Sequence, residues 1–279
     1  MKRGRARAGG WAAAVVALAL GLSLTACSAT GPASVVGRQT LRIGVKDNQP
    51  GLGLRLPDGR FVGFDVDVAR YVAAQLGVRP DHITFVPVTS ATREAALENG
   101  TVDMVIATYS ITPKGETKVT FGGPYYVAHE DTMVRAGDTA IRSVEDLKGK
   151  RLCQVTGSIS WERVTQELNI KAKLVPAASY SACVTMLRDG RVDAVSTDDL
   201  ILAGFADQAG TAVRIVNAPF SYERYGIGLR KGDVSGCEAV NRAVSQMYLD
   251  GTAAALLQKW FGKTGLQLDT HVPQFEGCG

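Results

Sequence analysis

The sequence predicts an α/β fold in which two lobes enclose a cleft. Strand-like and helix-like segments alternate along residues 41–261, which is typical of parallel sheets covered by helices on both faces. A short motif of helix end, glycine and strand occurs twice. Hydroxyl-rich segments follow several predicted strands, at the sheet edge where open α/β proteins bind their ligands.

The first part of the alternating region predicts the following elements. Residues 41–45 (LRIGV) form an apolar run and predict a buried strand. Residues 65–76 predict a helix, because Val68, Val72 and Leu76 share one face and Gly77 follows as a stop signal. The other expected elements are a strand at 83–88, a helix at 90–98 capped by Ser90, a strand at 102–106, and an extended segment at 127–135 after a loop at 107–126.

The second part continues the alternation. Ser179 is a suitable cap for a helix at 179–188, and Gly190 is its stop signal. The other expected elements are a short helix at 143–147, strands at 151–155, 173–175, 192–195, 213–216 and 226–229, and helices at 160–168, 199–208, 238–249 and 252–261.

Residues 97–105 (LENGTVDMV) and 187–195 (LRDGRVDAV) form a near-repeat. Two explanations stay open. A glycine at a helix end is ordinary loop chemistry, or the chain contains two lobes of similar build. Each copy leads into hydroxyl or carboxylate side chains, which are Thr108, Ser110 and Thr112 after the first, and Ser196, Thr197 and Asp198 after the second. The repeat therefore predicts a small polar ligand held between the lobes.

The N-terminus predicts an exported lipoprotein. Basic residues precede an uncharged apolar run at 11–24, which is too short for a comfortable membrane span and fits a signal peptide. It ends in Leu24-Thr25-Ala26-Cys27, which resembles a bacterial lipobox with Cys27 as the lipidated residue. An ordinary signal peptide with a chance cysteine is the alternative. We expect a signal at 1–26, a flexible tether at 27–37, and a lipid-anchored location on the extracellular face of the cell membrane.

Charge and cysteine content limit the classes of ligand and partner that the sequence can suit. Four of the 31 basic residues lie in the signal, which leaves 27 basic and 27 acidic residues, and no basic stripe points to nucleic acid. The four remaining cysteines favour disulfides in an exported chain. Three pairings are open, and we prefer Cys153–Cys183 and Cys237–Cys278 because each pair falls in one predicted unit. Without a CxxC motif and with three histidines, we expect neither a metal nor a cofactor.

The polar residues at the strand ends suit an amino-acid zwitterion. Asp198 is placed to bind an ammonium, and the candidate donors for a carboxylate are Thr112, Lys114, Ser158 and the Ile159 N–H. Residues 156–160 (TGSIS) precede a predicted helix, whose N-terminal N–H groups favour an anion. Charge-assisted hydrogen bonds of this kind are strong in a closed cleft. Asp198 also suits the N-cap of the helix at 199–208, and this alternative stays open.

Four segments together resemble a known family. Residues 63–69 (GFDVDVA), 107–126, 156–158 (TGS) and 192–198 (VDAVSTD) are similar to the extracellular solute-binding proteins, family 3, of polar amino-acid ABC transporters. The resemblance covers residues 38–265. Within that family, residues 47–54 (DNQPGLGL) and 225–229 (YGIGL) look most like the glutamate-binding lipoproteins of actinobacteria.

The resemblance implies a two-lobed, periplasmic-binding-protein-like (type II) α/β fold with a hinge and an inter-lobe cleft. Lobe 1 would comprise residues 38–130 and 222–279, and lobe 2 residues 131–221. The function implied is that of a monomeric binding subunit, not an enzyme, which delivers glutamate, aspartate or another polar amino acid to an ABC permease and its ATPase. A sensor that reports to a membrane partner would carry the same motifs. A dehydratase on this fold is a further alternative, although none of its three histidines is well placed for acid–base chemistry.

The resemblance also assigns roles to residues. Asp198 would bind the ligand's α-ammonium, and Ser158 and the Ile159 N–H its α-carboxylate. A side-chain carboxylate would be approached by Lys46, Arg93 and Thr108, beside the hydroxyls of Ser110 and Thr112. One position departs from the family, because Gly115 stands where relatives carry an arginine that forks onto the α-carboxylate. Lys114 is a point charge and not a fork, and Arg55 and Lys118 are the other candidate substitutes.

Overall fold

The computed structural model describes Met1, Gly4 and residues 34–278. The predicted signal peptide, the lipidation site Cys27 and most of the tether therefore lie outside the described residues. In the described part of the chain, no helix is both long and apolar enough to cross a membrane.

A five-stranded mixed sheet forms the first half of the fold. Its order is β5–β1–β6–β13–β7, in which β1 pairs in parallel with β5 and β6, and β13 runs antiparallel to β6 and β7. Apolar side chains form a buried cluster on each face, so the sheet is covered on both sides. Its strands are β1 (Leu41–Val45), β5 (Ile83–Pro87), β6 (Met104–Val105), β7 (Val119–Ala128) and β13 (Glu223–Arg230).

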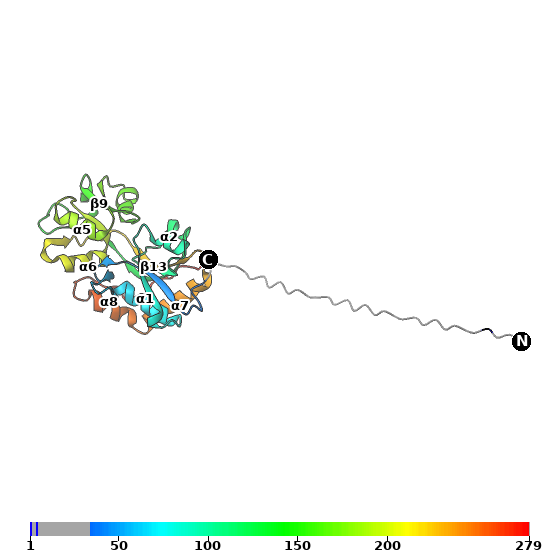
Figure 1. Ribbon diagram of the computed structural model, residues 1–279. Coiled ribbons are helices and arrows are strands. Elements are labelled where there is room, and N and C mark those ends of the chain that lie inside the picture. Colours follow the sequence, from blue (N-terminus) through cyan, green and yellow to red (C-terminus); the bar gives the residue numbers. More distant parts are fainter. Residues whose placement is uncertain (2–3, 5–33, 279) are drawn as a thin grey trace. The chain divides into compact units, whose positions relative to one another are not determined.

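Three helices gather on one face of this sheet. They contact one another and lie together in Figure 1, and they are α1 (Phe64–Gln75), α7 (Val234–Leu249) and α8 (Thr252–Phe261). The opposite face carries α2 (Arg93–Glu98) and the short α3 (Pro113–Glu116). A small antiparallel sheet of β2 (Asn48–Gln49), β3 (Gly53–Arg55) and β4 (Phe61–Val62) leads into α1.

The second half contains two smaller sheets. In one, β8 (Glu130–Arg135) lies between β11 (Val195–Asp198) and β12 (Val213–Ile215), and both pairings are antiparallel. In the other, β9 (Arg151–Val155) pairs in parallel with β10 (Lys173–Ala177). The helices of this half are α4 (Ser160–Glu162), which continues as a π-helical turn at Arg163–Glu167, α5 (Tyr180–Arg188) and α6 (Asp199–Ala209). Short 3-10 turns occur at Pro80–His82, Val144–Leu147 and Gly210–Ala212.

The near-repeat has the same structural role in both halves. Gly100 and Gly190 follow α2 and α5 with φ of 73° and 72°, a left-handed conformation that glycine adopts without strain. The aspartate of each copy then accepts a backbone N–H from the start of a neighbouring strand. Arg42 N–H, in β1, donates to Asp103 Oδ2, and Arg151 N–H, in β9, donates to Asp193 Oδ2, both at 2.8 Å. Each arginine also bonds its aspartate through the guanidinium. In both copies, the aspartate thus binds the start of a neighbouring strand in the same way.

Several predicted elements were wrong in type or extent. The expected loop at 107–126 includes most of β7, whose Tyr125 and Tyr126 are fully buried. Gly122 allows this packing, because a Cβ there would lie 2.6 Å from Val240 Cγ1 of α7. The expected single extended segment at 127–135 is divided between β7 and β8 at His129. The expected parallel pairing is found only in part, because β13 pairs antiparallel with β6 and β7, and β8 pairs antiparallel with β11 and β12.

Helix starts were the other source of error. The helix predicted at 90–98 begins at Arg93 and Ser90 does not cap it, whereas Ser179 does cap α5 by accepting Ala182 N–H. The helix predicted at 238–249 begins at Val234, because Asp233 accepts Gly236 N–H as its cap. The strand predicted at 192–195 begins at Val195, as β11, and an isolated parallel bridge between Ala194 and Leu152 precedes it.

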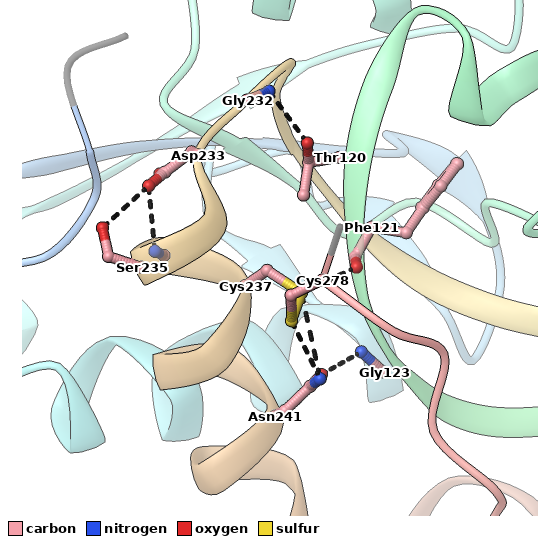
Figure 2. Close-up of a disulfide and its surroundings, with 10 residues drawn as sticks. Thr120, Phe121, Gly123, Gly232, Asp233, Ser235, Cys237, Asn241 and Cys278 are labelled. Carbon is pink, nitrogen blue, oxygen red and sulfur yellow. Dashed lines mark hydrogen bonds between the residues drawn. A yellow bond between two sulfur atoms is a disulfide. The ribbon is translucent and has the colours of Figure 1, made fainter. Parts of the chain in front are cut away.

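Both preferred disulfides are present. Cys153 on β9 is bonded to Cys183 on α5, and Cys237 on α7 is bonded to Cys278 near the end of the chain. Figure 2 shows Asn241 beside the second disulfide, where its amide nitrogen donates to Cys278 Sγ and its amide oxygen accepts Gly123 N–H. Glu276 N–H also donates to Gly123 O at 3.0 Å, so the C-terminal segment is attached to both α7 and β7.

Candidate ligand-binding site

A small cavity of about 20 Å³ is lined by residues from both halves of the fold. Six of the eight residues predicted to bind ligand line it. The first half contributes Ser90, Arg93, Thr108 and Ser110, and the second half contributes Ser158, Ile159, Ser160, Tyr180, Asp198 and Ile201. Ten residues from loops, strand ends and the starts of helices, far apart in sequence, thus enclose one polar space.

Asp198 provides the negative charge of this cavity. It ends β11 and directly precedes α6, but its side chain makes no capping hydrogen bond. Instead, its Oδ2 accepts the hydroxyl of Tyr225 at 2.6 Å. Burial, reinforced by the charge of Glu223, raises the pKa of Asp198 well above its usual value. A cation bound beside Asp198 would therefore relieve an unfavourable buried charge.

Two further acids lie behind Asp198. Glu130 is its cross-strand partner on β8, and Glu223 begins β13. Arg163 bonds Glu223 through Nε at 2.8 Å and Nη2 at 3.3 Å. Glu130 is fully buried, and among the described residues neither of its carboxylate oxygens has a hydrogen-bond partner. Burial, together with the charges of Asp198 and Glu223, raises the pKa of Glu130 well above its usual value, so this end of the cavity favours a positive group.

Arg93 provides the opposing charge. Its guanidinium carbon lies 3.7 Å from the ring centroid of Tyr109, a cation–π arrangement. One terminal nitrogen is 3.4 Å from the carbonyl oxygens of Ala107 and Thr108, which is long for a hydrogen bond. Its Nε is buried without a partner among the described residues. Burial lowers the pKa of Arg93, and the guanidinium retains donors for an anion.

Lys46 lines a second small cavity, which adjoins the first. The two cavities share Ser90 and Tyr180, and the second also contains Asn48 and Gln49. Lys46 Nζ donates to Ser90 Oγ at 2.8 Å. Burial, followed by repulsion from Arg93, lowers the pKa of Lys46 well below its usual value. An anion near Ser90 would stabilise the charged form of Lys46.

Thr108 is held in place from below by Asp65. Its backbone is in the left-handed region, with φ of 45°, which is unusual for a residue other than glycine. Asp65, near the start of α1, accepts Thr108 N–H at 2.9 Å and the Tyr125 hydroxyl at 2.8 Å. The Thr108 hydroxyl bonds Gln49 Oε1 at 3.2 Å. Through these contacts, Asp65 holds the backbone of Thr108 in its position in the cavity lining.

The stability of the fold should depend on pH through Asp65. Burial raises the pKa of Asp65 from 3.8 to about 6, against the opposing effects of Tyr125, Thr108 N–H and Lys46. Because the folded-state pKa is the higher one, its stabilising contribution is complete below pH 3.8 and is lost as pH rises through about 6. Relative to Asp65→Asn, which cannot titrate, the wild type should lose about 2 kcal/mol of unfolding free energy between pH 4 and 7. Urea unfolding of both proteins, without ligand, tests this. A difference that stays constant with pH would contradict it.

The TGS turn contributes a hydroxyl network. Ser158 Oγ and Ser160 Oγ bond the hydroxyl of Tyr180 at 2.5 and 2.9 Å, and Ser160 Oγ donates to Thr197 Oγ1 at 3.3 Å. Gly157 has φ of 78°, and a Cβ there would lie 2.5 Å from Ala91 N. The glycine therefore lets this turn of the second half approach the loop before α2 in the first half.

Comparison with known proteins agrees with this geometry. The family of "Bacterial extracellular solute-binding proteins, family 3" matches residues 41–263. The chain belongs to this family. It is 40% identical over 276 residues to the glutamate-binding protein GluB of Corynebacterium efficiens, with 94% of each chain covered, and 40% identical over 267 residues to GluB of Corynebacterium glutamicum, with 91% and 90% covered.

Solved structures confirm the predicted fold class. An ancestral arginine-binding protein bound to arginine matches with a TM-score of 0.74 and 36% identity, over 81% of this chain and 99% of that one. The fold of this member of family 3 is therefore the two-lobed α/β fold with a cleft between the lobes. An extracellular solute-binding protein is the class that this membership establishes.

The segment around Gly115, where the resemblance predicts an arginine, lies beside the cavity and not in it. Thr112 lines a separate groove with Lys114 and Arg163, and its hydroxyl is occupied as the cap of α3, accepting Gly115 N–H at 3.0 Å. Ile159 lines both spaces. Neither of the other candidate substitutes, Arg55 and Lys118, lines the cavity. Lys114 shares this groove with Ile159, which also lines the cavity.

Four lining residues were missed as ligand-binding candidates by sequence analysis. Ser90 and Ser160 were interpreted as helix caps or starts, and Tyr180 and Ile201 fell inside the helices predicted at 179–188 and 199–208 without a role of their own. They are, in order along the chain, Ser90, Ser160, Tyr180 and Ile201. Each sits at or near a helix N-terminus that follows a strand, which is the general position that α/β folds use for ligands. That positional rule was the only available signal.

Proposed function

We propose that this chain is the extracellular, lipid-anchored binding subunit of an ABC importer for acidic or polar amino acids, with glutamate or aspartate as its ligand. A lipid at Cys27 would hold it on the outer face of the cell membrane, where it delivers ligand to a permease and its ATPase without a chemical step. The similarity to two GluB proteins named as glutamate-binding supports this ligand class.

The observation that carries the proposal is the presence of groups of opposite charge in one buried cavity. Asp198 and Arg93 both line it, together with several hydroxyl groups. In the proposed complex, Asp198 binds the α-ammonium, and Ser158 and the Ile159 N–H bind the α-carboxylate. Arg93, Lys46 and Thr108 then approach a side-chain carboxylate. Charge-assisted bonds in a closed, dry site give high affinity for such a zwitterion.

Capture is proposed to occur by closure of two lobes about a hinge. Lobe 1 comprises residues 38–130 and 222–279, and lobe 2 residues 131–221. The division of strands supports these boundaries, because the five-stranded sheet draws on the first set and β9 to β12 on the second. Ligand contacts from both lobes exist only in the closed form, so ligand shifts the population toward closure.

A thermal-shift screen of the twenty amino acids tests the function. The protein is first unfolded and refolded to remove any ligand that copurifies. A ligand at a thousand times its Kd stabilises the folded state by about 4 kcal/mol, which raises Tm by several degrees. We expect the largest shifts with glutamate and aspartate, confirmed by calorimetry. A shift with none of the twenty would overturn the proposal, and a largest shift with a basic amino acid would overturn the ligand class.

Restoring an arginine at position 115 is expected to tighten binding by about tenfold, because a guanidinium fork adds two charge-assisted bonds to a carboxylate. A Cβ at Gly115 would lie 3.1 Å from Phe121 Cε2 and 3.2 Å from Thr112 Oγ1, so the Phe121 ring has to shift slightly. Gly115→Ala is the matched control, since it carries this crowding without the charge. Calorimetry that finds Gly115→Arg no tighter than Gly115→Ala would mean that the carboxylate is anchored elsewhere.

A further inference from the structure

Tyr180 has a position that no other tyrosine of the described chain shares. It is the first residue of α5, directly after the capping Ser179, and it is only 6% exposed. It lines the cavity that contains Asp198 and Arg93, and it also lines the adjoining cavity that contains Lys46. Ser90 is the only other residue in both linings. Tyr180 and Ser90 therefore form the partition between the two spaces.

The hydroxyl of Tyr180 is fixed by its neighbours. It lies within hydrogen-bond distance of both Ser158 Oγ and Ser160 Oγ, which belong to the turn proposed to hold the α-carboxylate. Burial, with the nearby charge of Asp198, raises the pKa of the phenol, so the hydroxyl remains a neutral donor. The network thus fixes the ring as well as the hydroxyl, and a fixed ring makes a definite boundary.

The partition stands in the path of the ligand side chain. With the ammonium at Asp198 and the α-carboxylate at Ser158, a side chain that reaches toward Lys46 has to pass between Ser90 and Tyr180. Lys46 marks the far side of that passage, since its Nζ bonds Ser90 Oγ at 2.8 Å. The depth available before this partition sets how many methylene groups the ligand can carry.

We propose that Tyr180 and Ser90 together determine which side-chain length of the ligand this protein accepts. The inference rests on the proposed function and deepens it. It assigns to Tyr180 a specificity role: its ring closes the passage between the cavities, and its hydroxyl supports the turn at Ser158. Ligands whose side-chain carboxylate ends at the partition are accepted, and longer homologues are rejected because the ring cannot move without breaking two hydrogen bonds.

The test uses three dicarboxylic amino acids that differ by one methylene each, namely aspartate, glutamate and 2-aminoadipate. Calorimetry measures their Kd values for the wild type, Tyr180→Phe, Tyr180→Leu and Tyr180→Ala. A wild-type preference for the shorter ligands is expected. In Tyr180→Ala and Tyr180→Leu, the Kd of 2-aminoadipate relative to glutamate should fall about fourfold, which corresponds to the one extra methylene group that the enlarged space would admit. Tyr180→Phe keeps the ring but loses the two hydrogen bonds that hold it, so it should relax the length preference in part and weaken all binding about fivefold, through loss of the hydroxyl.

Controls separate the possible failures. Tyr222→Ala removes a tyrosine that is 76% exposed and lines neither cavity, and it should change no ratio. Thermal unfolding of each variant shows whether it folds, and Tyr180→Leu keeps the test decisive if Tyr180→Ala does not. An unchanged ratio of Kd values in folded Tyr180→Leu would overturn this inference about chain length and would leave the proposed function standing. Failure of the wild type to bind any of the three ligands would overturn this inference, and failure with all twenty amino acids would overturn the proposed function as well.

Discussion

Replacing Asp198 with asparagine is expected to weaken amino-acid binding at least about 100-fold and to leave the fold intact. Removing one partner of a buried charge pair costs about 3–5 kcal/mol, and each 1.4 kcal/mol is a factor of ten in Kd. Asparagine keeps the volume of the side chain, and its amide oxygen can still accept the Tyr225 hydroxyl that Asp198 Oδ2 accepts at 2.6 Å. The ammonium of the ligand would then face a neutral amide in a site that has lost its compensating charge.

The unliganded protein should respond in the opposite sense. Because burial raises the pKa of Asp198, the charged carboxylate is a burden on the empty site, so Asp198→Asn should unfold at the wild-type temperature or above it. Asp207→Asn, on the exposed face of the same helix α6, is the matched control and should bind normally. Calorimetry that finds wild-type affinity in Asp198→Asn would remove Asp198 from the site.

The fold was predictable where local signals and tertiary packing agree. β1, β9 and α8 appear with the predicted bounds, because each is a short apolar run or a periodic face between clear stop signals. The missed strand β7 shows where such signals fail. Its Gly-Gly-Pro-Tyr-Tyr run looks like a loop, yet Val240 of α7 leaves room only for a glycine at 122. No local sequence pattern predicts that a helix more than a hundred residues later will pack against Gly122.

The site was predictable to the extent that its residues end strands. Asp198, Thr108 and Ser110 follow the two copies of the near-repeat, and the structure brings all three to one cavity. Ser90 and Tyr180 were missed because their role depends on how the two halves face each other, which local sequence does not encode. Thr112 carries the expected hydroxyl, but the cap of α3 uses it. Sequence alone does not distinguish two suitable roles for a hydroxyl, and here the helix cap already supplies its hydrogen bond.

Removing the disulfides is expected to have the largest effect on stability. The two bonds join residues separated by 30 and 41 positions. Closing loops of this size in the unfolded chain is worth about 4 kcal/mol for each bond in the chain-entropy account. Cys153→Ala/Cys183→Ala and Cys237→Ala/Cys278→Ala should each lower the unfolding free energy by about that amount in urea titrations. The oxidised mature domain should show no labelled thiols after denaturation without reductant, and two or more labelled thiols would contradict the framework.

The difference between the two variants separates chain entropy from native contacts. Loop closure alone predicts losses that differ by only about 0.3 kcal/mol, since the cost grows with the logarithm of loop length. The bond to Cys278 also fixes the C-terminal segment, in which Glu276 N donates to Gly123 O at 3.0 Å and Glu276 pairs with Arg224. Phe275 packs against the main core as part of the same segment. If releasing the segment breaks these contacts, Cys237→Ala/Cys278→Ala should lose at least about 1 kcal/mol more than the other pair. Equal losses would show that the segment stays in place without its disulfide, and that the bond acts through the unfolded chain alone.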